Sequence, residues 1–298
     1  MAEKTHGSVP SGRILVSYIA TDGGIDALRL AVALAKGRGL AIDIVMAMTG
    51  RDATPGLYPH DRGYHSILEQ QVAGWLKDAR AEIPAGIGVT TRVATGDSVP
   101  DIIVAQATEL GSTIVVVGSQ GGGIFKRLSL GNVVNTLLHS CPVPLAIAPR
   151  GYNHPGPVER ITVMFGTRPG ATDIISLGLE RAEQRGVPLR FVSLNIKNEQ
   201  PDASDAIAAI ERTASPELAE QARALVRAGR ATAEVVSASS IEEATGSLDW
   251  LPGEVAHMGS SRVAPEGRLF LGTTATQIVR YIPVPAIVIP NGYMHRAR

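Results

Sequence analysis

The chain has 298 residues, enough for about two domains, and a content of 44% hydrophobic and 19% charged residues is typical of a globular protein. Its 28 basic and 28 acidic residues give a formal net charge of zero, which argues against nucleic acid or an anionic membrane as a partner. The single cysteine excludes an internal disulfide framework and a cysteine-based zinc cluster. Because residues 1–12 lack the apolar core of a signal peptide and no apolar run approaches the roughly 18 residues of a membrane span, we expect a cytoplasmic protein.

Strands and helices alternate along the first half of the sequence. The predicted strands cover residues 13–18, 41–47, 87–94, 113–117 and 145–148, and the predicted helices cover residues 25–35, 66–81, 99–110 and 132–139. A polar loop is expected over residues 49–65. The alternation predicts a parallel sheet with helices on both faces. Cys141 falls just before the last strand, and we interpret it as a packing residue rather than a reactive thiol.

The second half repeats the pattern of the first. Residues 160–165 match residues 13–18 at an offset of 147, and residues 283–293 match residues 142–152 at an offset of 141. The other elements predicted there are strands at 189–194, 231–236, 255–258 and 286–289, a helix at 171–185, and a helical segment at 202–228 that is broken near Ser215 and Pro216. A linker rich in Gly and Pro separates two predicted domains, residues 12–150 and residues 158–293.

A glycine-rich segment follows the fourth strand of the first half. Gly118 and Gly121 to Gly123 come after three consecutive valines, and a helix is predicted from Asn132, whose side chain can cap it. Free backbone N–H groups at such a turn and helix start suit a phosphate. A tight strand-to-helix connection without a ligand is the alternative, and the spacing alone supports both interpretations equally.

With this motif the chain resembles the universal stress protein family in its tandem two-domain form. The family motif is Gly, two residues, Gly, nine residues, Gly, then Ser or Thr. Gly118, Gly121 and Gly131 occupy these glycine positions, with Asn132 where Ser or Thr is usual. In the second half, Gly259, Gly272 and Thr273 match, but Arg262 replaces the middle glycine. A Pro-Val-Pro sequence before each last strand is also typical of the family, and the resemblance covers nearly the whole chain.

The resemblance implies two Rossmann-like α/β domains of the adenine nucleotide alpha hydrolase-like type. Each would have a five-stranded parallel sheet of order 3-2-1-4-5, with an ATP or AMP cleft, with or without Mg, at the carboxyl ends of strands one and four. The nucleotide contacts implied in the first half are Val117, Gly118, Ser119, Gly121, Gly123, Gly131, Asn132, Val133 and Ala47. Those implied for a weaker site in the second half are Met258, Gly259, Arg262, Gly272, Thr273 and Thr274.

The chain departs from the family pattern on the side of the cleft that recognises the base. Ile19 and Gly166 stand where nucleotide-binding members have an Asp after the first strand, and Asp22 could replace that carboxylate only if the loop bends differently. Arg262 could pair with a phosphate, but we favour a solvated surface arginine. The same choice arises for Lys126 and Arg127. The phosphate half of the first site is therefore predicted to be intact and the base-reading half to be altered.

Motifs for catalysis and metal binding are missing from the sequence. There is no P-loop and no dinucleotide-binding fingerprint, and His60 and His65 lack metal-ligand spacing, so we nominate no catalytic residue and no metal ligand. The function predicted is an ATP- or AMP-binding module in stress response, with at most weak ATP hydrolysis. The alternative is a ligand-free regulatory or scaffold protein. The resemblance also implies that the last strands pair the two domains into an internal pseudo-dimer, and it leaves a homodimer of the whole chain open.

Overall fold

The structure, a computed structural model, describes residues 12–49, 62–119, 130–166, 172–196, 206–260 and 269–293, with only the backbone of residues 62–66. The first half contains β1 (Gly12–Ser17), α1 (Asp22–Ala35), β2 (Leu40–Thr49), α2 (Arg62–Ala81), β3 (Val89–Gly96), α3 (Val99–Glu109), β4 (Ile114–Gly118), α4 (Asn132–Ser140) and β5 (Leu145–Ala148). The second half contains β6 (Arg160–Met164), α5 (Thr172–Arg185), β7 (Leu189–Ile196), α6 (Ala206–Thr213), α7 (Pro216–Arg227), β8 (Ala231–Ala238), α8 (Ile241–Gly246), β9 (Glu254–Gly259), α9 (Thr273–Tyr281) and β10 (Ala286–Ile289).

All the described strands form one sheet, in the order β3-β2-β1-β4-β5-β10-β9-β6-β7-β8. Within each half the strands are parallel and the order is 3-2-1-4-5, so the predicted fold class is confirmed. The halves meet at β5 and β10, which pair antiparallel with Ile147 opposite Ala286. Consequently the carboxyl ends of the strands lie at opposite edges of the sheet in the two halves.

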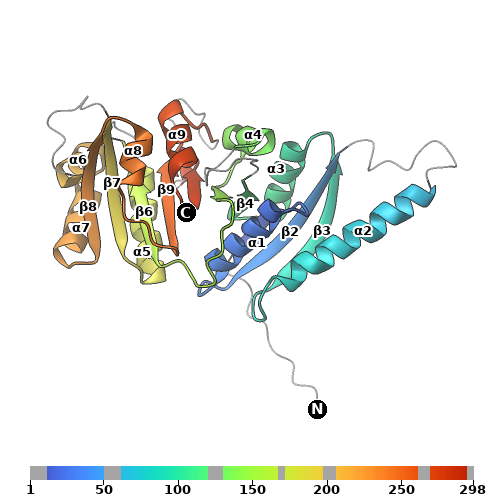
Figure 1. Cartoon of the computed structure of the whole chain (residues 1–298). Coiled ribbons are helices and arrows are strands. Elements are labelled where there is room, and N and C mark those ends of the chain that lie inside the picture. The colour runs from blue at the N-terminus through green and yellow to red at the C-terminus, as the bar shows by residue number, and fades with distance from the viewer. Residues whose placement is uncertain are drawn as a thin grey trace, which may run out of the picture.

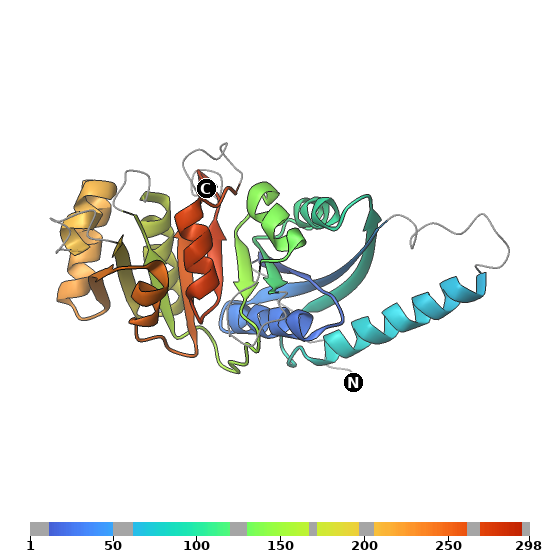
Figure 2. The ribbon, with the colours of Figure 1, turned by 45° about the horizontal axis from the view of Figure 1, so that its top comes forward.

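Helices cover both faces of this sheet, because right-handed crossovers place α1 and α2 on one face of the first half and α3 and α4 on the other (Figure 1). The second half repeats the arrangement, with α5 to α7 on the face of α1, and α8 and α9 on the face of α4. Figure 2 shows α4 and α9 side by side across the junction, and the imidazole of His139 on α4 meets the ring of Phe270 edge-on at 5.1 Å. Both central strands are fully covered, since every residue of β5 and β10 is buried.

Matching hydrogen bonds fix the turn after each central strand. The carboxylate of Asp26 on α1 accepts from the N–H of Gly151 at 2.8 Å, and that of Asp173 on α5 accepts from the N–H of Gly292 at 3.0 Å. Both glycines have positive φ, near +70°, where a side chain would strain the backbone. Burial raises the pKa of Asp26, and the bond from Gly151 opposes that rise. The two hydrogen-bonded pairs occupy equivalent positions in the two halves, so the repeat in the sequence is also a repeat in the structure.

The break predicted near Ser215 and Pro216 in the helical segment 202–228 is confirmed: the segment divides into α6 and α7, because Ser215 caps α7 and Pro216 occupies its first turn, while residues 202–205 lie outside the described part. Other predictions need correction. The helices α8 and α9 were not predicted. Residues 62–65, predicted as loop, are already the first turn of α2. The amino-terminal part of α2 projects past the edge of the sheet in Figure 1, and its buried side chains, Val72, Leu76 and Ala79, lie nearer its carboxyl end.

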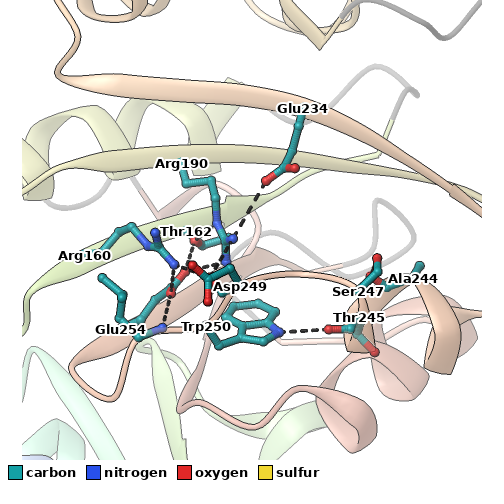
Figure 3. Close-up of polar contacts among 11 residues, drawn as sticks. Arg160, Thr162, Arg190, Glu234, Ala244, Thr245, Ser247, Asp249, Trp250 and Glu254 are labelled. Carbon is teal, nitrogen blue, oxygen red and sulfur yellow. Dashed lines mark hydrogen bonds and ion pairs between the residues drawn. The ribbon is translucent and has the colours of Figure 1, made fainter.

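A buried ion network joins the amino ends of the second-half strands β6, β7 and β9 (Figure 3). The carboxylate of Glu254 on β9 is fully buried and accepts from Arg160 at 2.5 Å and from Arg190 at 2.7 Å. Thr162 also donates to Glu254 and accepts from Nε of Arg190 at 2.9 Å. The guanidinium of Arg190 lies 4.7 Å from the ring centre of Trp250, a cation–π distance. Because each charge is paired and hydrogen-bonded, the network can remain buried.

The first half holds a smaller version of this network with the acid on a different strand. Arg13 on β1 donates to the buried carboxylate of Asp43 on β2, with Nε at 2.7 Å, and Thr90 on β3 donates to the same group. Arg13 and Arg160 are equivalent positions, but Arg190 stands where the first half has Asp43. In each half the equivalent arginine, which is partly buried, therefore pairs with a buried acid from a different neighbouring strand.

Among the described residues, no helix has both the length and the apolar character that crossing a membrane requires.

Replacing Glu254 with alanine should lower the free energy of unfolding by about 3–5 kcal/mol, because it leaves two arginines without their shared carboxylate. The matched control is Glu234→Ala, since that carboxylate is exposed, lies 3.8 Å from Arg190 and should cost less than about 1 kcal/mol. Urea unfolding of both variants measures the difference. Equal losses would contradict a dominant role for the buried acid.

The thiol of Cys141 should react slowly with iodoacetamide at pH 8 in the native protein. Its side chain is fully buried, and burial raises its pKa to about 11. The thiolate fraction should then be about 100-fold below that of an ordinary cysteine, and the rate should rise on unfolding in urea. Labelling of the native protein at the rate of the unfolded chain would refute this packing role.

Candidate functional site

The candidate site of the first half lies where β1 and β4 end and α4 begins, at the carboxyl edge of the sheet. Gly118 is the last residue of β4, and its neighbour Ser119 is buried, with its N–H donating to Ala148 of β5 at 3.0 Å. Gly131 precedes α4. The structure thus brings together Gly118, Ser119, Gly131 and Asn132 at one edge, while the predicted residues Gly121 and Gly123, with Lys126, Arg127 and His60, lie outside the described residues.

Gly118 is required by the close approach of two backbone segments. A Cβ at this position would lie 1.9 Å from the carbonyl oxygen of Gly23, and one at Gly23 would lie 2.9 Å from the carbonyl oxygen of Ser119. A Cβ at Gly24 would lie 1.9 Å from the carbonyl oxygen of Ile19. The turn between β1 and α1 therefore contacts the end of β4 directly. In the sequence, the pair Gly23 and Gly24 before a helix is a usable signal of such a close approach, although we made no prediction from it.

The prediction that Asn132 caps α4 is wrong. Gly131 is the N-cap, with φ −63° and ψ 164°, and Asn132 is the first helical residue. Gly272 caps α9 in nearly the same conformation, with φ −68° and ψ 165°. The other helices with a described N-cap are capped by a hydroxyl that accepts from the backbone, from Thr21 on α1, Ser98 on α3, Ser215 on α7 and Ser240 on α8.

Because its N-cap is a glycine, α4 receives no side-chain acceptor from the cap residue for its first N–H groups. These groups carry the positive end of the helix dipole, which favours an anion. An anion bound there would take the place that a hydroxyl takes on α1, α3, α7 and α8.

The two halves differ in how they use the serine that follows the fourth strand. The hydroxyl of Ser260 accepts from the N–H of Phe270 at 2.6 Å and donates to its carbonyl at 3.0 Å, which ties the end of β9 to the segment before α9. The equivalent hydroxyl of Ser119 is buried and has no hydrogen-bond partner in the part of the chain that the structure describes. A buried hydroxyl without a partner costs about 1–3 kcal/mol, so this side of the first site is incomplete without a further polar group.

The first site is apolar at the position where the sequence already predicts the loss of a carboxylate. Ile19 is 37% exposed, and Asp22 is exposed in the first turn of α1. In the second half, a Cβ at Gly166 would have open space around it. Ala47 lies half-buried near the end of β2. The side chains of Ile19 and Ala47 therefore offer apolar contact here and no hydrogen bond.

The remaining predicted positions that the structure describes lie in the core, at the end of β9 or at the start of α9. Val117 and Met258 are buried core residues of β4 and β9, and the half-buried Val133 packs on the core. Gly259 ends β9, and Thr273 and Thr274 are the first two residues of α9. Arg262 lies outside the described residues. Within the described ranges, no group of three or more His, Cys, Asp or Glu side chains is placed to hold a metal ion.

These features define an open α/β protein whose parallel strands end in a glycine-lined edge, the edge at which this class of sheet binds its ligands. Residues 11–149 match the model of the universal stress protein family. A universal stress protein of Mycobacterium tuberculosis strain H37Rv and another of Mycobacterium bovis are each 28% identical to the chain over 290 residues, which cover 93% of this chain and 99% of each relative. The chain is therefore similar to universal stress proteins along nearly its whole length, and its first half matches the model of that family.

Solved structures agree on the fold. The crystal structure of a universal stress protein from Archaeoglobus fulgidus aligns with a TM-score of 0.65 at 17% identity, covering 95% of this chain and all of the other. A universal stress protein structure from Pseudomonas aeruginosa aligns with a TM-score of 0.55 at 17% identity, covering 95% of both chains. At these identities the likeness concerns the fold alone.

Replacing Gly118 with alanine should destabilise the protein by at least about 2 kcal/mol, because the added Cβ would overlap the carbonyl oxygen of Gly23. Gly74→Ala is the matched control: Gly74 lies exposed within α2, a Cβ there meets nothing within 4 Å, and alanine should stabilise the helix by about 0.5–1 kcal/mol. Thermal unfolding compares the two. A neutral effect of Gly118→Ala would show that the turn after β1 can move away from β4.

Proposed function

We propose that this protein binds ATP or AMP through its first half. The observation that carries the proposal is the glycine-capped start of α4, the helix that follows β4 in the chain, whose N-cap supplies no side-chain acceptor for the first backbone N–H groups. Those N–H groups would hold the phosphates, and the buried hydroxyl of Ser119 would gain a partner. Mg²⁺ would enter with the nucleotide, bound mainly through phosphate oxygens.

The second half is, in this proposal, a diverged tandem copy that binds nucleotide weakly or not at all. Its strand order and helix caps match the first half. Its serine hydroxyl, however, is already engaged by Phe270, and the middle glycine of the motif is Arg262. Hydrolysis would be weak at most. We place the protein in the cytoplasm, in keeping with a single, buried free thiol. A homodimer is a further partner that size measurement in solution would test.

A ligand-free regulatory or scaffold protein is the second candidate function, favoured by one observation. Ile19, partly exposed and apolar, replaces the acid expected to recognise the base. A site that loses a hydrogen-bonding partner loses discrimination between ligands. On this view Gly118 serves only the close packing against Gly23.

Calorimetry with ATP and AMP separates the two candidates. The sharpest variant is Asn132→Pro: proline is tolerated as the first helical residue, and Gly131 already has the extended backbone that a residue before proline needs. The substitution removes one N–H from the start of α4. Because a hydrogen bond to a charged group contributes about 1.5–3 kcal/mol, nucleotide affinity should fall by about tenfold or more.

Thr273→Pro makes the same change at the start of α9 and serves as the matched control. The first-half proposal requires that it leave nucleotide affinity unchanged. Absence of heat and of thermal stabilisation with millimolar nucleotide in the unmodified protein would favour the scaffold. Equal losses of nucleotide affinity in both variants would indicate that both halves bind nucleotide.

A further inference from the structure

A cavity of about 170 Å³ lies between the two halves, on the face of the sheet covered by α1 and α5. Leu34 and Arg38 line it from the end of α1 and the turn after it, Leu177, Arg181 and Arg185 from α5, and His257 from β9. On the first-half side it reaches the amino ends of the strands, away from their carboxyl edge. None of its lining residues belongs to either predicted nucleotide site. It therefore exists only because the two halves pair, and it is a separate site.

Positive side chains line this cavity, and the carboxylate of Glu180, which does not line it, also acts on Arg38. Three arginines line it, and no carboxylate is among its lining residues, all of which lie in described parts of the chain. The guanidinium of Arg185 donates to the carbonyl of Leu34 at 2.9 Å, and that of Arg181 donates to the side chain of Gln184 at 3.0 Å, so both of these partners are neutral. Burial and the charges of Arg38 and Arg181 lower the pKa of Arg185 to about 10. The guanidinium groups therefore destabilise one another's charged state.

His257 adds a polar group to the cavity. Its side chain is 5% exposed, and its Nδ1 has no hydrogen-bond partner in the described structure. Burial, with the charges of Arg185 and Arg181, lowers its pKa to about 3, so the ring is neutral at pH 7 and can donate one hydrogen bond. The equivalent residue of the first half is Val116, which is fully buried. The imidazole thus replaces a hydrocarbon side chain at the place where the arginines converge.

Arginines near the ends of α1 and α5 also have a simpler structural role. Positive side chains at helix carboxyl ends stabilise the helix dipole, as the bond from Arg185 to Leu34 illustrates. That role explains why each arginine, taken separately, lies near a helix end. It does not account for an open cavity between them or for a buried imidazole with an unpaired nitrogen.

We propose that this cavity between the halves binds a phosphate group, free or on a small molecule, through Arg38, Arg181, Arg185 and His257. A phosphate group carries about 1.5–2 negative charges at pH 7, so it offsets more of the positive charge of three guanidinium groups than a monovalent anion does. Guanidinium groups bind such oxyanions in paired hydrogen bonds. The ring N–H of His257 would donate to a phosphate oxygen. The volume admits a phosphate ion or a small phosphate monoester rather than a nucleotide.

Titration calorimetry of the full chain at pH 7 and constant ionic strength tests this with three probes: inorganic phosphate, glycerol 3-phosphate and acetate. We expect one phosphate per chain and at least tenfold weaker binding of acetate. Arg181→Gln should weaken phosphate binding at least tenfold. Arg80→Gln, which removes an exposed arginine far from the cavity, should not change it. Binding of inorganic phosphate alone would identify the free ion as the ligand, and binding of both would admit a phosphorylated small molecule.

Two further variants distinguish phosphate binding in the cavity from phosphate binding at the candidate nucleotide site. His257→Val restores the residue found at the equivalent position of the first half, and it should weaken phosphate binding while preserving the fold. Asn132→Pro, which alters the candidate nucleotide site, should leave phosphate binding intact. Loss in Asn132→Pro but not in Arg181→Gln would overturn the proposal and assign phosphate to the nucleotide site. Absence of heat with phosphate, or equal binding in all variants, would also overturn it and leave the arginines as helix-end charges.

Discussion

The antiparallel pairing of β5 with β10 is the interaction on which the arrangement of the whole molecule depends. Each of these strands has only four residues, yet all of them are buried, and together they join two parallel sheets into one. A four-residue edge left alone would expose unpaired backbone groups. Pairing covers both exposed strands at once, and it makes the strands of the second half run opposite to those of the first. The glycine-containing carboxyl ends of the strands therefore face opposite directions in the two halves. The same pairing creates the arginine-lined cavity.

The buried charges at the amino ends of the strands show how two halves of one architecture can diverge without losing stability. Both keep an arginine at the start of the first strand, Arg13 or Arg160. In one half the acid comes from the second strand, as Asp43, and in the other from the fourth, as Glu254. What must be preserved is charge pairing, because an unpaired buried charge is far more costly than a changed partner.

The sequence predicted the strands well because buried parallel strands are nearly continuous apolar runs, as in β4 and β5. Helix starts were harder: the side chain of Asn132 was expected to act as the cap, whereas the backbone turns one residue earlier, at Gly131. The role of Gly23 depends on a carbonyl contact across the sheet edge, which chain spacing does not reveal. The cavity between the halves could not be predicted, because Arg38 and His257 are over 200 residues apart along the chain.

Helix α4 has a different neighbour at each of its ends. Its first residues form the candidate phosphate-binding edge of the first half, and near its last turn His139 contacts Phe270 of the second half. Phe270 is held in turn by the hydroxyl of Ser260 at the end of β9. Nine helical residues span only about 13 Å and behave as a rigid rod. The same short helix therefore joins the candidate site of the first half to the aromatic contact with the second half, with the two ends held at a fixed separation.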